Sequence, residues 1–140
     1  MTIFPAFDIA GSALTTDQTW MDAISDNLAN VNTVKPFDQP AFQERFIEAQ
    51  ALPSNPGDPV GVGGGVEVAS IQYGDSTGVV HSDPGNPMAN SQGLIRSPDV
   101  DMAQNMTDLI IAQRSYELNL SVVQSASQSY QQAIQINGKS

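Results

Sequence analysis

The sequence predicts a mainly α protein with a small β part, in which a heptad helix at each end of the chain pairs with the other. Two observations support this prediction. Apolar residues recur at alternating steps of four and three in both terminal segments, and the stretch between them is rich in glycine, proline and polar residues. We therefore divide the chain into an N-terminal helix at 1–34, a short β-rich and irregular middle region at 35–97, and a C-terminal helix at 98–140.

The N-terminal segment carries its heptad line without interruption. Pro5 suits a first helical turn, where its missing N–H costs no hydrogen bond. Thr33 and Pro36 end the helix, since the residue before a proline avoids the helical conformation. Only Asp17 is polar in the line, whose other members are Ile3, Phe7, Ala10, Leu14, Met21, Ile24, Leu28 and Val31.

The middle region reads as short extended segments separated by turns. Residues 41–52 are ambiguous between a helix and an extended run. A loop rich in proline and glycine follows at 53–59. Short strands are predicted at 66–71, 79–80 and 94–95, where apolar and β-branched residues recur between turn signals.

The C-terminal segment carries the longer heptad line. Asp99 or Asp101 provides a helix N-cap after Pro98, and Asn137 with Gly138 marks the end. At about 1.5 Å per residue such a helix is roughly 50 Å long, which is too long to be covered within a small core. The line consists of Met102, Met106, Leu109, Gln113, Tyr116, Leu120, Val123, Ser127, Tyr130 and Ile134.

Two ordinary amphipathic helices in a compact monomer would produce the same periodicity. The length of the two heptad lines, together with a middle region too polar to give both of them a core, favours helices that also take part in assembly.

The composition excludes several classes of partner. The formal net charge is −10 and no basic patch is present, so neither nucleic acid nor an anionic membrane is an expected partner. No apolar run approaches the ~20 residues that span a bilayer, so no direct membrane insertion is expected. The segment before Lys35 has no basic residue and lacks the charged region of a cleavable secretory signal.

The sequence carries no recognisable catalytic, metal-binding or cofactor-binding pattern. His81 is the single histidine and cysteine is absent, so neither a zinc site nor a catalytic triad can be completed convincingly. The glycine run at 61–65 lacks the lysine and following helix of a phosphate-binding loop. We expect no enzymatic activity and no cofactor.

Four local strings carry more information than the periodicity does. The strings ISDNLANVNT at 24–33 and NMTDLIIAQRSYELN at 105–119 resemble the paired terminal signatures of the axial proteins of the bacterial flagellum. Within that group, FDIAGSAL at 7–14 and DPGNPMANSQGLI at 83–95 resemble the proximal rod proteins of the C type. The matching motif residues are Asn27, Ala29, Asn30, Thr33, Asp83, Pro84, Gly85, Pro87, Gly93, Pro98, Arg114, Tyr116 and Asn119.

The chain also departs from the family pattern in three places. Thr33 is followed by Val34 and Lys35 rather than by a glycine and an aromatic residue. Asn105 stands where the family usually has an acidic residue, and Asp99 stands where asparagine is more common.

The resemblance implies a structural subunit of the bacterial flagellum basal body, in the proximal rod outside the cytoplasmic membrane. Its terminal helices would form an antiparallel coiled coil lining the inner tube, in contact with copies of itself and other flagellar rod proteins. Export would use the flagellar type III export apparatus with no cleaved signal peptide. The expected assembly residues are Phe7, Leu14, Met21, Ile24, Leu28, Val31, Met106, Leu109, Tyr116, Leu120, Val123 and Tyr130.

Two other readings remain open at this point. One is another flagellar axial component of the same family. The other is a soluble helical adaptor or export chaperone, which would be stable on its own, whereas the ends of a rod subunit would be frayed before assembly.

Overall fold

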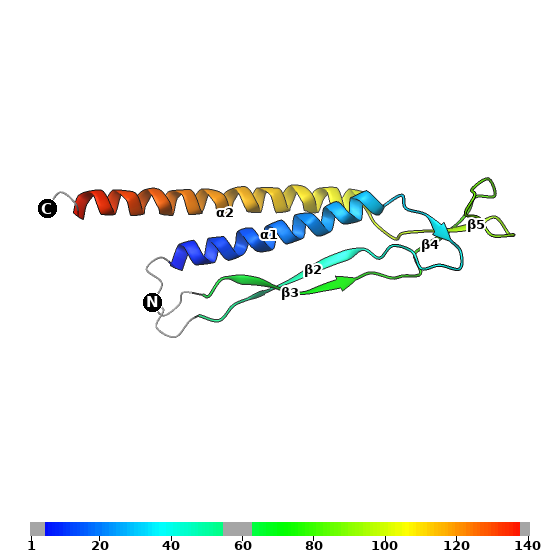
Figure 1. The fold of residues 1–140 in the computed structure, drawn as a ribbon, viewed down its shortest axis with the longest axis horizontal. Helices are drawn as coiled ribbons and strands as arrows, with labels where there is room; N and C mark the ends of the chain where they lie inside the picture. Colours follow the sequence, from blue (N-terminus) through cyan, green and yellow to red (C-terminus); the bar gives the residue numbers. More distant parts are fainter. Residues whose placement is uncertain (1–4, 55–62, 138–140) are drawn as a thin grey trace.

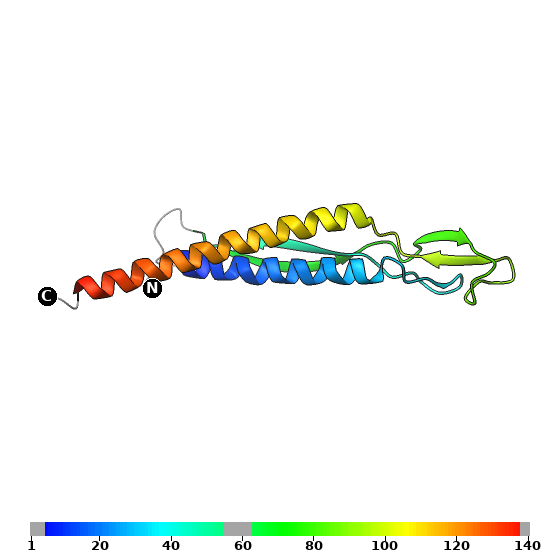
Figure 2. The same cartoon turned by 90° about the horizontal axis from the view of Figure 1, so that it is seen from above.

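The two helices lie side by side and run in opposite directions (Figures 1 and 2). Helix α1 comprises Pro5–Asn30 and helix α2 comprises Met102–Asn137. The computed structural model describes residues 5–54 and 63–137; Ile3 and most of the predicted loop at 53–59 lie outside them. The two helices with a small β part between them agree with the predicted mainly α class.

Both helices are shorter than predicted at their inner ends. Helix α1 ends at Asn30, whose Nδ2 donates to the Asp26 carbonyl oxygen at 2.9 Å and whose own carbonyl accepts from the Thr33 N–H at 2.9 Å. Helix α2 begins after Asp101, whose Oδ1 accepts from the N–H groups of Ala103 at 2.9 Å and Gln104 at 3.0 Å. Of the two predicted caps, Asp101 is therefore the one used.

Strands β2 (Arg45–Ala51) and β3 (Val66–Tyr73) form an antiparallel hairpin that packs along α1 (Figure 1). Most of the ambiguous segment at 41–52 is thus a strand. Alternation explains why: Ile47 is half-buried, whereas its neighbours Phe46 and Glu48 are exposed. A register shift between Glu48 and Ala49 marks a bulge in the hairpin.

A second, three-stranded sheet projects beyond the inner ends of the helices (Figure 1). Its order is β1 (Lys35–Pro36), β5 (Leu94–Ser97) and β4 (Val79–Ser82), and both pairs are antiparallel. The strands predicted at 79–80 and 94–95 are confirmed, and each is two residues longer than predicted.

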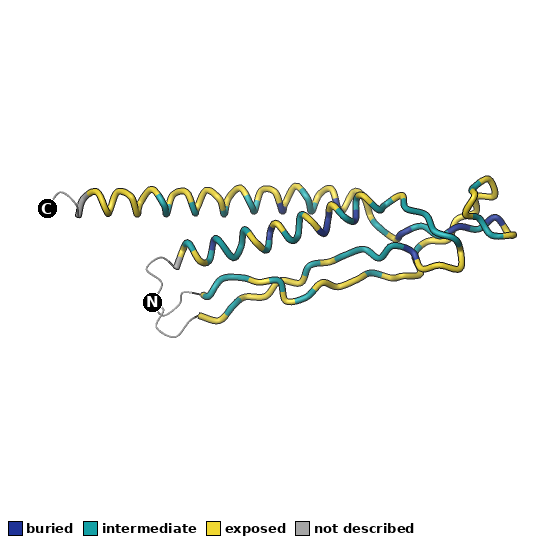
Figure 3. The backbone as a smooth tube through the Cα atoms, viewed as in Figure 1, coloured by how far each residue is buried: buried dark blue, intermediate teal, exposed yellow. Residues whose placement is uncertain are grey.

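The buried core of the described residues is small and follows α1 (Figure 3). Small side chains predominate in it, which allows close approach of the backbones. Most of the surface of α2 is exposed (Figure 3). The buried apolar residues are Ala10, Ala23, Ile24, Ala41, Ile95 and Ala112, and the buried polar residues are Asp17, Asn27 and Asn105.

Substituting alanine for Gly93 is expected to loosen the projecting sheet. Gly93 has a φ of 74°, which L side chains rarely adopt, and an added Cβ would lie 2.9 Å from Pro84 Cγ. Strain of this kind costs about 1–3 kcal/mol. Gly93→Ala should therefore speed amide hydrogen exchange in β4 and β5. Gly85→Ala is the matched control, since its Cβ would meet only Asp83 Oδ1, at 3.8 Å. Equal exchange in both variants would contradict the prediction.

Candidate assembly interface

The heptad line of α1 faces the interior of the molecule. Ala10, Asp17 and Ile24 are buried. The remaining described members are half-buried: Phe7, Leu14, Met21, Leu28 and Val31. The periodicity of this helix therefore matches one continuous covered face.

On α2 the covered face differs from the predicted line. Leu109, Tyr116 and Val123 are half-buried, whereas Met106, Leu120 and Tyr130 are exposed in the single chain. The covered residues that replace the exposed ones are Asn105, Ala112, Asn119 and Ala126. The sequence-based prediction selected the large apolar residues as the contact positions. In the structure, the close packing of the two helices also uses small side chains and hydrogen-bonded asparagines.

A buried carboxylate joins the middle of the two helices. Asp17 is 8% exposed, and its Oδ2 accepts hydrogen bonds from Ser115 Oγ and Asn119 Nδ2, both at 2.9 Å. Asp17 was the polar interruption in the α1 line, and Asn119 is one of the motif residues. Because a buried polar group must find partners, this contact fixes which turns of the two helices meet.

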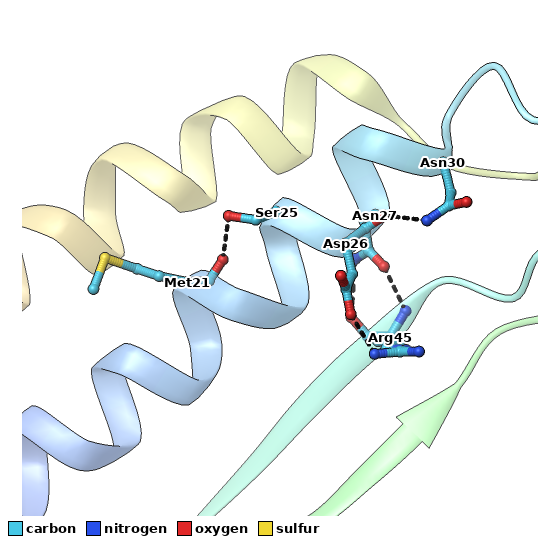
Figure 4. Close-up of polar contacts among 6 residues, drawn as sticks. All are labelled: Met21, Ser25, Asp26, Asn27, Asn30 and Arg45. Atoms are coloured by element: carbon cyan, nitrogen blue, oxygen red, sulfur yellow. Dashed lines mark hydrogen bonds and ion pairs between the residues drawn. The ribbon is translucent and has the colours of Figure 1, made fainter.

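A second polar contact ties α1 to both α2 and β2. Asn27 is 1% exposed. Its Nδ2 donates to the Arg45 carbonyl oxygen and to Asn105 Oδ1, both at 3.0 Å, and its Oδ1 accepts from the Arg45 N–H at 2.9 Å. Figure 4 shows Asn27 pointing from α1 toward Arg45 at the start of β2. The side-chain amide thus pairs with both backbone groups of Arg45, the first residue of β2.

Asn105 extends this contact on the α2 side. It is 3% exposed, and its Nδ2 donates to Glu44 Oε1 at 2.6 Å and to the Asp101 carbonyl oxygen at 2.9 Å. A carboxylate at this position would have no proton to donate to either acceptor. The neighbouring ion pair between Arg45 and Asp26 is partly exposed (Figure 4), so it contributes about 0–1 kcal/mol.

Helix α2 also presents large apolar side chains to solvent. Its C-terminal end extends past the N-terminal end of α1 (Figure 2). Contiguous exposed apolar surface is typical of protein–protein contact sites. The exposed residues are Met102, Met106, Ile110, Ile111, Leu118, Leu120, Val122, Tyr130 and Ile134.

Comparison with known proteins assigns the chain to a family. The family model "Flagella basal body rod protein" matches residues 7–36, and "Flagellar basal body rod FlgEFG protein C-terminal" matches residues 91–136. The flagellar basal-body rod protein FlgC of Escherichia coli O157:H7 is 32% identical over 88% of this chain and 89% of the relative. The chain belongs to the FlgC-type flagellar basal-body rod proteins.

Longer matches extend this similarity across the middle region. The FlgC proteins of Bacillus subtilis and Borreliella burgdorferi are 30% and 32% identical over 97% of this chain, covering 99% and 98% of the relatives. This FlgC-type chain is thus a structural subunit of the flagellar basal-body rod.

The motif residues of this FlgC-type chain lie in three places. Asn27, Asn30 and Asn119 form the helix contacts and cap described above, and the Thr33 hydroxyl donates to Asn30 Oδ1 at 3.3 Å. Tyr116 is half-buried on α2, whereas Arg114 is exposed. Ala29 on α1 is also exposed. Of the motif residues outside the helices, Gly93 and Pro98 are buried, whereas those in the loop before β5 are exposed: Asp83, Pro84, Gly85 and Pro87.

The titratable groups with shifted pKa values lie on the surface of this FlgC-type chain. Hydrogen bonds from Ser70 and Gln72 lower the pKa of Glu48, and the Thr77 N–H lowers the pKa of Asp75. Among the described residues, no group of three or more His, Cys, Asp or Glu side chains is arranged to hold a metal. His81 is exposed. No helix in the described part of the chain is long and apolar enough to cross a membrane.

Proposed function

We propose that this rod subunit assembles helically with copies of itself and with other flagellar rod proteins into a torque-transmitting tube. The observation that carries the proposal is the apolar surface of α2, which α1 leaves uncovered over much of its length. A contact between unlike surfaces need not close into a ring, so one kind of interface can repeat along a helical path and build a tube of many subunits.

The helix pair provides the wall of that tube. We propose that α1 and α2 act as an antiparallel coiled coil lining the inner tube. The covered residues of α2 support this, because they recur at steps of four and three along the helix: Asn105, Leu109, Ala112, Tyr116, Asn119, Val123 and Ala126. The parts at 1–34 and 98–140 would form this inner layer, and 35–97 would pack outside it.

The function needs no chemistry. A role in transmitting force fits the rod family and the α2 surface, and we propose that the chain is not an enzyme and uses no cofactor. Torque would pass through many modest hydrophobic and hydrogen-bonded contacts between subunits, each of which resists sliding along the helix axis.

We further propose that the chain leaves the cytoplasm through the flagellar type III export apparatus, without a cleaved signal peptide. The segment before Lys35 lacks the basic region that the general secretory route recognises. The absence of cysteine means that no disulfide can lock the chain before an unfolded passage.

The test compares cells with and without an intact flagellar export gate. The chain should reach isolated basal bodies only in gate-positive cells, and mass spectrometry should find its amino terminus complete, apart from the initiator methionine. Deleting residues 1–14 should hold the chain in the cytoplasm. Export without the gate, or a terminus cut after about 20 residues in the manner of a signal peptide, would overturn the export route. A chain absent from gate-positive basal bodies would overturn the assembly.

A further inference from the structure

A groove between α1 and β2, which reaches the first turns of α2, is open on the surface of the molecule. Its apolar part is a hollow of about 230 Å³ lined by Thr16 and Trp20 of α1 and by Ile47 and Ala49 of β2. Trp20 and Ile47 also line a second hollow of about 170 Å³, so the two hollows are neighbours along the groove.

The second hollow carries unbalanced negative charge. Glu44 and Asp108 both line it. Within the described part of the chain, their oxygen atoms accept hydrogen bonds from neutral amides only, since Asn105 donates to Glu44 and Gln104 donates to Asp108 at 2.9 Å. Arg45 is the only basic residue in the lining, and it forms its ion pair with Asp26. The groove therefore presents an apolar end beside an acidic end.

Helix α2 presents the complementary pair of side chains on its exposed surface. Leu118 is 69% exposed. Arg114, one turn before it, is the only basic residue of α2 and is exposed, with neither an ion pair nor a hydrogen-bond partner among the described residues. Four residues of helix span about 6 Å. Glu44 and Ile47 lie about 10 Å apart along an extended chain. The spacing on the helix is therefore shorter than the spacing on the groove, and the long side chain of Arg114 can span the remaining distance to Glu44.

We propose that α2 of a second copy of this chain docks on the groove, with Leu118 in the apolar hollow and Arg114 beside Glu44 and Asp108. This contact rests on the proposed assembly and names the surfaces it uses. Each copy carries a net charge of −10, so a contact that places a basic side chain of one copy against carboxylates of the other reduces the repulsion between them. Groove and helix are different surfaces, so the contact propagates from copy to copy.

Cross-linking tests the contact directly, because the chain has no cysteine of its own. Cells would make two differently tagged copies, one with Leu118→Cys and one with Ala49→Cys, and basal bodies would be isolated under oxidising conditions. A disulfide needs Cβ atoms about 4 Å apart, so the mixed dimer should form several-fold more than with the control Gln50→Cys, whose residue does not line the hollow. A cross-link to a different rod protein would overturn the choice of a second copy.

Charge reversal supplies the second measurement. Arg114→Glu should reduce incorporation into basal bodies several-fold, and Asp108→Arg in the same chain should restore part of it. Lys35→Glu is the matched control, since it changes the net charge equally at a residue outside the groove. Normal incorporation of Arg114→Glu without the mixed dimer would overturn this contact, while leaving the proposed rod assembly intact.

Discussion

Asn27→Asp is expected to lower the free energy of unfolding by about 2–4 kcal/mol. The substitution keeps the size of the side chain but removes both N–H donors, which reach the Arg45 carbonyl oxygen and Asn105 Oδ1 at 3.0 Å. A carboxylate would then face two acceptors in a site where Asn27 is 1% exposed. Only the Arg45 N–H, which donates to Oδ1 at 2.9 Å, would remain as a donor, and burying a charge with so few hydrogen bonds is strongly unfavourable.

Urea denaturation of the purified chain at neutral pH measures this effect. The difference from the unaltered protein should narrow as the pH falls from neutral toward the ordinary pKa of an aspartate. Burial raises the pKa of the new carboxyl in the folded chain, and the protonated carboxyl regains one donor. Asn32→Asp is the matched control: it adds the same charge at an exposed position just beyond α1. Equal unfolding midpoints for the two variants would show that the amide does not join the helices to the hairpin.

The regular elements of this fold could be predicted from local pattern. Periodicity located both helices, alternation located the strand at 66–71, and apolar pairs beside turn-rich segments located the strands at 79–80 and 94–95, because each signal is contained in a short window of residues. The segment at 41–52 could not be assigned in this way. Phe46 lies on the exposed face of β2, so its apolar character says nothing about the side that packs against α1.

The contacts between elements were harder to predict. Met106 and Leu120 belong to the predicted line by their apolarity, yet the neighbouring Asn105 and Asn119 are the residues that meet α1. An asparagine in a helix normally indicates a solvated face, and only the partner atoms on Asn27 and Asp17 reveal that these amides are buried or half-buried contacts. Those atoms lie 78 and 102 residues away in sequence, beyond any local pattern.

This arrangement separates two roles on α2. Its covered face combines small and polar side chains with the half-buried Leu109, Tyr116 and Val123, whereas most of its larger apolar residues remain exposed in the single chain. The predicted heptad line of α2, which was chosen because its residues are apolar, therefore contains two kinds of position. Some are covered and stabilise the single chain, and others are exposed and available for assembly. Substitutions at one position of each kind should separate the two roles.

Leu109→Asp and Leu120→Asp should therefore fail in different ways. Leu109 is half-buried, so a charge there should lower the free energy of unfolding by about 2–4 kcal/mol. Leu120 is 38% exposed, so Leu120→Asp should change it by only about 0.5 kcal/mol. In the rod, however, a neighbouring subunit covering α2 would bury the new carboxylate without a partner, and swimming should be lost.

Urea denaturation and swimming in soft agar, measured on the same variants, separate these effects. Gln124→Asp, which introduces a carboxylate at an exposed polar position one turn beyond Leu120, controls for the added charge. It should leave both stability and swimming near normal. Full swimming with Leu120→Asp would show that no subunit covers this part of α2. Unchanged stability with Leu109→Asp would mean that the covered face adds little to the folded chain, and that α1 is held by the polar contacts of Asp17 and Asn27 instead.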